Sequence, residues 1–147
     1  MLCIYGFDLY SENEKNIERA KEILIACKTV TSNYISESGK PSRNAWAFTT
    51  IYQLAQKNGS NVFVEIIEKS LNNEGKIYAL CALFRLDREK FNALSENYRL
   101  KKISVLWYCS QSEKESNFFF EKIKDENFFN MLLLFPIPEY EKTIEPD

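Results

Sequence analysis

Apolar and polar residues alternate with helical spacing through most of the first hundred positions. Residues 11–30 place apolar side chains on one face, with charged residues between them. Those apolar positions are Ile17, Ala20, Ile23, Leu24 and Cys27. Steps of three and four residues predict a helix. Residues 2–10, "LCIYGFDLY", form an almost continuous apolar and aromatic run, which predicts a short strand or an extended lead-in.

Four more helices are predicted up to residue 98. Ser42 belongs to the residue types that cap helix N-termini, and Gly59 to those that end helices. Asp87 has the side chain needed to cap the last of the four helices. In the second helix the valines would also suit a strand, but acidic residues between its apolar positions favour a helix. The predicted helices are residues 43–58, 61–71, 75–86 and 88–98.

Two of these helices resemble each other at an offset of 32 residues. The segment "AWAFTTIYQL" aligns with "IYALCALFRL", so that Trp46 matches Tyr78 and Ala47 matches Ala79. A period in the thirties with two short helices per unit is typical of helical-hairpin repeats. The alternative is a chance similarity between two amphipathic helices. The repeat predicts a short array of antiparallel helical hairpins, HEAT-like or TPR-like.

The pattern changes after residue 100. Residues 102–109 alternate between two faces, which predicts one or two short strands there. The next segment, from "EKESNFFF" onward, predicts a helix to about Ile123 and a shorter one to Leu134. The fold class is therefore mainly α. We expect one helical domain over residues 1–135 and an extended, partly disordered tail over residues 136–147, which contains three prolines.

Composition narrows the functional classes. The chain has 147 residues and a net charge of −2, so no general basic field favours nucleic acid. No apolar run is long enough to span a membrane. The N-terminal sequence lacks a basic region followed by a cleavage site of small residues, so we expect a cytoplasmic protein, or a periplasmic or exported one if the chain is processed. The oligomeric state stays open.

Candidate chemistry is sparse. The chain contains no histidine, the commonest general base and metal ligand. Nucleotide-binding glycine loops and hydrolase elbows are also absent from the sequence. Glu65 and Glu68 lie one helical turn apart and could converge on a metal or a substrate, although a solvated helix face beside Lys69 is the favoured explanation. We identify no catalytic residue, no cofactor-binding residue and no metal ligand.

Aromatic and cysteine residues suggest contacts rather than catalysis. Phe118, Phe119 and Phe120 are consecutive, so at least one must lie outside the core face of its helix and could contribute to a partner surface. Cys81 lies on the core face of its predicted helix, where a buried free thiol is the ordinary outcome. A disulfide between Cys81 and Cys109 is the alternative, and it would imply an oxidising compartment.

Several segments together resemble a family of small uncharacterised bacterial proteins associated with microcin gene clusters. These segments are "SRNAWAF", "EGKIYALCALFRLDREKF", the apolar strand that ends in Cys109, and the helix that ends in "FFNML". The resemblance covers about residues 42–132. It implies a bacterial setting close to toxin production or immunity, and it supplies no reaction and no catalytic residue.

The sequence therefore predicts a non-enzymatic protein-binding module, of the immunity or accessory type, whose acidic scaffold would attract a basic bacterial toxin domain. One alternative is an enzyme that acts through carboxylates such as those of Glu65 and Glu68. Another is a self-associating structural protein, which would show a large symmetric apolar interface.

Overall fold

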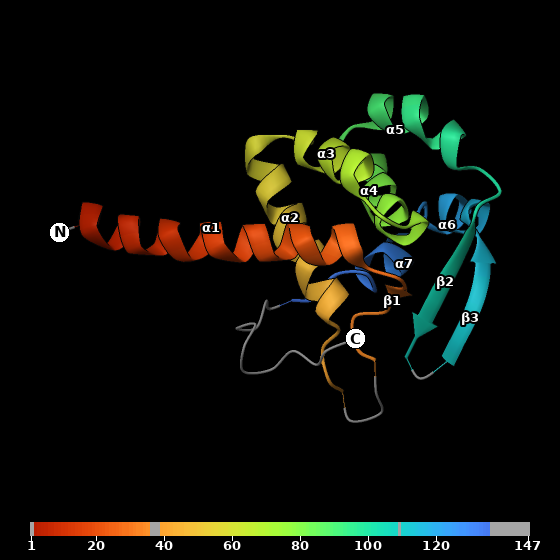
Figure 1. Ribbon diagram of the computed structural model, residues 1–147, viewed down its shortest axis with the longest axis horizontal. Coiled ribbons are helices and arrows are strands. Elements are labelled where there is room, and N and C mark those ends of the chain that lie inside the picture. Colours follow the sequence, from red (N-terminus) through yellow and green to blue (C-terminus); the bar gives the residue numbers. More distant parts are fainter. Residues whose placement is uncertain (1, 36–38, 109, 136–147) are drawn as a thin grey trace.

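The computed structural model describes residues 2–35, 39–108 and 110–135, and for residues 2–13 it describes the backbone alone. The described chain is mainly helical and carries one small sheet (Figure 1). Residues 136–147, for which we predicted an extended, partly disordered tail, lie outside the described residues. In chain order the elements are α1 (Leu2–Ala26), β1 (Val30–Thr31), α2 (Arg43–Asn58), α3 (Asn61–Lys69), α4 (Asn73–Leu86), α5 (Arg88–Ser95), η1 (Glu96–Tyr98), β2 (Lys102–Trp107), β3 (Ser110–Glu115), α6 (Ser116–Lys122) and α7 (Glu126–Asn130).

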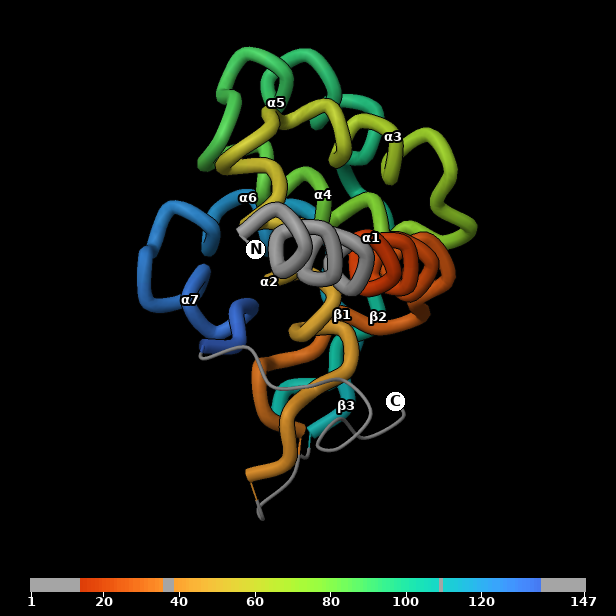
Figure 2. The backbone as a smooth tube through the Cα atoms, turned by 90° about the vertical axis from the view of Figure 1, so that its left-hand side faces the viewer, coloured from red at the N-terminus to blue at the C-terminus, as the bar shows by residue number. Residues whose placement is uncertain are grey.

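The sheet has the order β1-β2-β3. The short β1 runs parallel to β2, with Val30 opposite Val105. The strands β2 and β3 form an antiparallel hairpin in which Trp107 lies opposite Ser110. Figure 2, which is turned by 90° from Figure 1, shows α3 and α5 above α1 and the strands below it. Because β2 lies between the other two strands, β3 forms one edge of the sheet.

Helix α4 is the centre of the fold. Its residues from Ile77 to Leu83 are all buried, and the helix contacts α1, α2, α3, α5, α6, β1 and β2. A helix that is covered on every side needs apolar residues all round rather than on one stripe. The small residues Ala79 and Ala82 allow these neighbouring elements to approach closely.

An aromatic cluster joins segments that are far apart in the sequence. The ring of Phe48 in α2 lies 5.2 Å from the ring of Tyr78 in α4 and 6.0 Å from that of Phe63 in α3, measured between centroids. Phe129 in α7 meets Phe48 edge to face at 6.1 Å. Such tilted arrangements suit the quadrupoles of aromatic rings. The cluster fixes the C-terminal helices against the first half of the chain.

Buried hydrogen bonds attach the sheet to α4. The Thr31 backbone N–H donates to the Tyr78 hydroxyl at 2.8 Å, and the Ser104 N–H donates to Oε2 of Glu74 at 3.0 Å. Buried backbone donors must find acceptors. The two side chains supply acceptors to strand N–H groups that do not bond to a neighbouring described strand. Glu74 is 8% exposed, which makes its position part of the core.

The start of α4 lies directly against the end of α1. The amide of Asn72 donates to the Cys27 carbonyl at 3.1 Å, and the Leu71 N–H donates to the Ile25 carbonyl at 2.9 Å. These bonds satisfy carbonyls that a helix C-terminus leaves unpaired. A Cβ atom at Gly75 would come within 3.0 Å of the Leu24 carbonyl oxygen. This close approach favours glycine at position 75.

The predicted helices after residue 42 are confirmed in type and order. The Ser42 hydroxyl accepts from the Ala45 N–H at 3.2 Å, and Gly59 ends α2 with a φ of 102°. The carboxylate of Asp87 accepts from the Lys90 N–H at 3.2 Å and caps α5. The second helix, for which a strand was the alternative, is α3. Whether the two helix pairs are equivalent repeats stays a proposal.

The prediction for the N-terminus was wrong at both ends of the first helix. Residues 2–10 are helical rather than extended, because lengthening an existing helix costs far less than starting one. The helix also ends at Ala26 and not near residue 30. The β-branched residues Val30 and Thr31 pair with β2 instead, which is the environment that favours them.

The prediction for residues 110–115 was also wrong in part. We assigned residues from 113 onward to a helix, but Ser110–Glu115 form β3, and α6 begins only at Ser116. The strand "SQSEKE" has no strand-favouring composition. It is extended because all six of its residues pair with β2, and the hairpin turn uses Tyr108 at a φ of 54°, a residue that gives no turn signal in the sequence.

Candidate functional site

A groove lies over the inner face of the β2–β3 hairpin, and α6 and α7 form its other wall. Its volume is about 430 Å³. Ile103, Val105 and Trp107 share one face of β2, where Ile103 and Val105 are buried and Trp107 is only partly buried. The lining residues are Val105, Trp107, Ser112, Lys114, Phe118, Phe119, Lys122, Asp125, Asn127, Phe128 and Met131.

Aromatic rings form the floor of this groove. Trp107 stacks on Phe128 with ring centroids 5.3 Å apart and planes inclined by 5°. Phe118 meets Phe128 edge to face at 6.1 Å. Phe119 is fully buried beneath them. Trp107, Phe118 and Phe128 are only partly buried, so their rings offer apolar area to a ligand as well as to the core.

Two lysines frame the groove. The Nζ atoms of Lys114 and Lys122 lie 5.3 Å and 5.8 Å from the centroid of the Phe118 ring. This is within the range of cation–π attraction. Neither lysine pairs with a carboxylate among the residues that the structure describes. Asp125 also lines the groove, but its Oδ1 accepts from the Asn127 N–H at 2.8 Å and caps α7.

The β3 strand borders the groove and is exposed along its whole length. Its side chains point alternately into the groove, as Ser112 and Lys114 do, and to the opposite face. No described element pairs with its outer edge. An edge strand of this kind presents unpaired backbone N–H and C=O groups, which can pair with a further strand. The groove thus combines apolar rings, positive charge and a free sheet edge.

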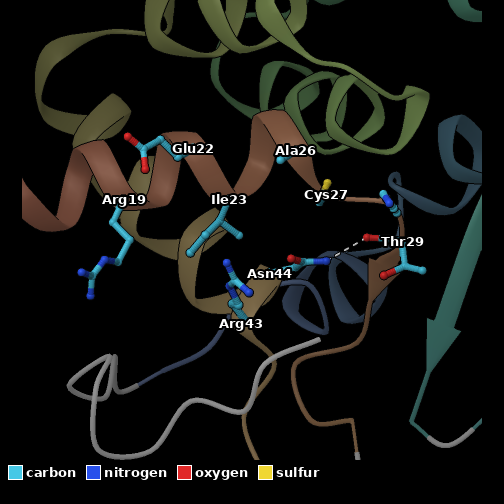
Figure 3. A pocket seen from close by; sticks show the side chains of 9 residues that line it. Arg19, Glu22, Ile23, Ala26, Cys27, Thr29, Arg43 and Asn44 are labelled. Atoms are coloured by element: carbon cyan, nitrogen blue, oxygen red, sulfur yellow. Dashed lines mark hydrogen bonds between the residues drawn. The ribbon is translucent and has the colours of Figure 1, made fainter.

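A second hollow lies between the end of α1 and the start of α2 and has a volume of about 790 Å³ (Figure 3). Arg19 and Arg43 reach toward it from the two helices, while the carboxylate of Glu22 points to the other side of α1. The Asn44 amide donates to the Thr29 carbonyl at 2.9 Å. Nε of Arg43 is buried and has no hydrogen-bond partner among the described atoms.

The charge in this second hollow is positive, but it is mostly solvated, because Arg19 and Lys28 are exposed. Water screens exposed charges strongly. None of its described lining residues is aromatic, so this lining offers little apolar area. The groove, which offers both features, is the better candidate for a specific contact.

Glu65 and Glu68, the carboxylates of the enzymatic alternative, both lie near Lys69 on α3. Glu65 binds Lys69 at 2.8 Å and lies 3.7 Å from Lys21. The hydrogen bond from Lys69 lowers the pKa of Glu65 below its usual value. Glu68 is exposed. Among the described residues no group of three or more histidine, cysteine or carboxylate side chains could hold a metal.

The structure describes only one of the two cysteines for which a disulfide was the alternative. Cys81 is a free thiol, buried in α4, and burial raises its pKa strongly. A thiol held in its neutral form is a poor nucleophile. Cys109 lies outside the described residues, so the alternative of a Cys81–Cys109 disulfide stays a prediction.

The aromatic prediction is partly confirmed. Phe119 and Phe120 are buried, and Phe118 is the partly exposed member of the three. Sequence reasoning missed the groove itself, because the second half of β3 was assigned to a helix. The signals that could have indicated it were the inward series ending at Trp107 and the lysines beside the phenylalanines.

Comparisons of the chain with family models, with curated proteins and with solved structures gave no match. None of the described helices is both long and apolar enough to cross a membrane.

Proposed function

We propose that this protein is a non-enzymatic protein-binding module that holds its partner at the groove and at the free edge of β3. The observation that carries the proposal is the open aromatic floor of Trp107, Phe118 and Phe128, which lies beside a strand whose outer edge pairs with no element of the described chain. Aromatic residues supply much of the binding energy at protein interfaces. Free sheet edges are a common docking place for extended segments.

The partner class proposed from the sequence is a bacterial toxin or an accessory protein, with this chain acting as an immunity-type protein. The net charge of −2 favoured a basic toxin domain. At the groove, however, Lys114 and Lys122 make the surface locally basic, so the part of the partner that docks there should be acidic and not basic. Net charge governs the approach of a partner over long distances, whereas the groove governs what docks.

The repeat interpretation belongs to the same proposal. We propose that α2–α3 and α4–α5 are equivalent helix pairs. The aligned residues Trp46 and Tyr78 are both buried, as are Ala47 and Ala79. Equivalent burial at aligned positions supports the repeat, and a helical array would present its outer helices and the hairpin as one extended surface.

The test measures binding of the purified protein to the products of the genes that neighbour its own, by calorimetry at low and high salt. Ser112→Arg places a long side chain in the groove and should weaken binding at least about tenfold, or about 1.4 kcal/mol. Gln111→Arg is the matched control, because it adds the same side chain to the opposite, exposed face of the same strand. It should leave affinity unchanged.

Two outcomes would overturn the proposal. If the two variants bind a neighbouring gene product equally well, the groove is not the contact surface. If the protein instead forms a stable dimer by light scattering, and Ser112→Arg dissociates it, the free edge of β3 serves self-association, as in the structural alternative.

A further inference from the structure

We propose that the groove selects an extended acidic segment of the partner, which adds as a fourth strand to the outer edge of β3 and places a carboxylate between Lys114 and Lys122. This inference rests on the proposed function and specifies the chemistry of its partner. Three features of the groove support it: its unbalanced charge, its free edge and the two-residue period of strands.

The two lysine charges at the groove are only partly balanced, because Asp125 is the one carboxylate among its described lining residues. Lys114 and Lys122 both lie close to the Phe118 ring, at 5.3 Å and 5.8 Å from its centroid, so like charges are gathered over one side chain. The lining carboxylate of Asp125 already caps α7 through its Oδ1. Within the described part of the chain no carboxylate pairs with either lysine. A carboxylate from a partner would supply the remaining counter-charge beside a low-dielectric aromatic surface.

The sheet provides the backbone template. The inner edge of β3 is occupied by β2 over six residue pairs, from Lys102 with Glu115 to Trp107 with Ser110. The outer edge faces no described element. An added strand would form main-chain hydrogen bonds there, and its alternate side chains would extend over the groove. A strand of five or six residues would match the length of β3.

The strand period sets the order of side chains in such a segment. Residues two positions apart point to the same face, so an aromatic or large apolar residue and an acidic residue must be separated by one position. The apolar side chain would then lie near Phe118 while the carboxylate meets the lysines. The residues between them would face Glu113 and Glu115 on the other side of β3, which favours neutral or basic side chains at those positions.

Trp107 provides a reporter for this test. The protein has two tryptophans, and Trp46 is 2% exposed in the core, whereas Trp107 lines the groove. The probe is the capped peptide Thr-Phe-Thr-Glu-Thr, titrated into the full-length protein while tryptophan emission is recorded. We expect a saturable change that Trp107→Phe abolishes. A second peptide with lysine in place of glutamate, and a third with phenylalanine and glutamate adjacent, should bind at least about tenfold more weakly.

Protein variants test the charge. Lys114→Glu and Lys122→Glu should each weaken binding of the acidic peptide and strengthen binding of the lysine peptide. Lys124→Glu is the matched control, because Lys124 is an exposed lysine of the same segment that pairs with Glu121 at 3.3 Å and lies outside the groove. It should change neither affinity. Circular dichroism of each variant confirms that the fold is retained.

Two N-methylated forms of the acidic peptide test the edge. Successive N–H groups of a strand point to opposite sides, so methylation at one alternate set blocks pairing with β3 and methylation at the other set does not. Only one form should lose binding. Equal binding of both forms would refute strand addition, and equal binding of the lysine peptide would refute the acidic preference.

The same variants separate this inference from the proposed function. If a neighbouring gene product binds, and Ser112→Arg weakens it while Lys114→Glu and Lys122→Glu do not, the groove binds protein but does not select acid. If that partner binds all variants equally well, the proposed function at the groove fails as well. A peptide that binds only through its phenylalanine, whatever the order of its residues, would overturn the selection rule.

Discussion

Replacement of Gly75 by alanine tests how closely α4 is packed against α1. The added Cβ would lie within 3.0 Å of the Leu24 carbonyl oxygen and 2.7 Å from Oγ of Ser70. A backbone oxygen cannot rotate away, so the last turn of α1 or the start of α4 must shift. Overpacking of this kind costs about 1 to 3 kcal/mol, and contact with backbone places the cost at the upper end of that range.

A second effect acts in the opposite direction. Alanine is better than glycine in a helix by about 1 kcal/mol, and Gly75 lies within α4. The net expectation is therefore a loss of about 2 kcal/mol in the free energy of unfolding. Urea denaturation followed by circular dichroism measures it, and the midpoint should fall while the slope with urea concentration stays the same.

The Ser70→Ala variant serves as a control for this experiment. In the parent protein the Ser70 hydroxyl donates to the Ile66 carbonyl at 2.6 Å. Its oxygen is the second atom with which the new Cβ would clash. If the double variant Ser70→Ala/Gly75→Ala loses as much stability as the single changes predict together, the clash is with Leu24. A Gly75→Ala protein as stable as the parent, or more stable, would refute the close approach.

Three further predictions concern the core and one helix cap. Ala79→Leu should cost about 1 to 3 kcal/mol in urea denaturation, because Ala79 is fully buried in α4, and Ala47→Leu should cost a similar amount if the two helices are equivalent. Tyr78→Phe should cost about 1 to 3 kcal/mol, because the buried Thr31 N–H loses its acceptor. Hydrogen bonding from the Lys90 N–H lowers the pKa of Asp87 below its ordinary 3.8. The Asp87 carboxylate therefore stabilises the fold fully at neutral pH and loses that effect as the pH falls below about 4. The melting temperatures of the parent and of Asp87→Asn should differ at pH 7 and converge in acid.

The helices α2 to α5 could be predicted because their local signals agree with the tertiary structure. Ser42 and Asp87 cap the helices that they were expected to cap, and apolar periodicity matches the buried faces. When capping, spacing and packing favour the same conformation, sequence alone is sufficient. The burial of Ala79 follows from the same agreement.

The hairpin and the groove could not be predicted, because their conformation comes from a neighbour. The β3 sequence has no apolar alternation, and only its pairing with β2 makes it extended. The turn at Tyr108 lacks the glycine or asparagine that marks such turns. The groove is lined by residues from β2, β3, α6 and α7. The wrong assignment within β3 was therefore enough to prevent prediction of the whole site.

The exposure of β3, which made the hairpin hard to predict, supports the function proposed for it. A strand exposed on both faces gains little from hydrophobic burial, so β3 is held mainly by its hydrogen bonds to β2. Trp107 and Phe128 stack beside it but leave part of their surface uncovered. A segment that pairs with β3 and covers these rings would supply both the missing neighbour and the missing apolar contact. Binding at this edge should therefore also stabilise the hairpin, because a ligand that binds only the folded form shifts the folding equilibrium toward it.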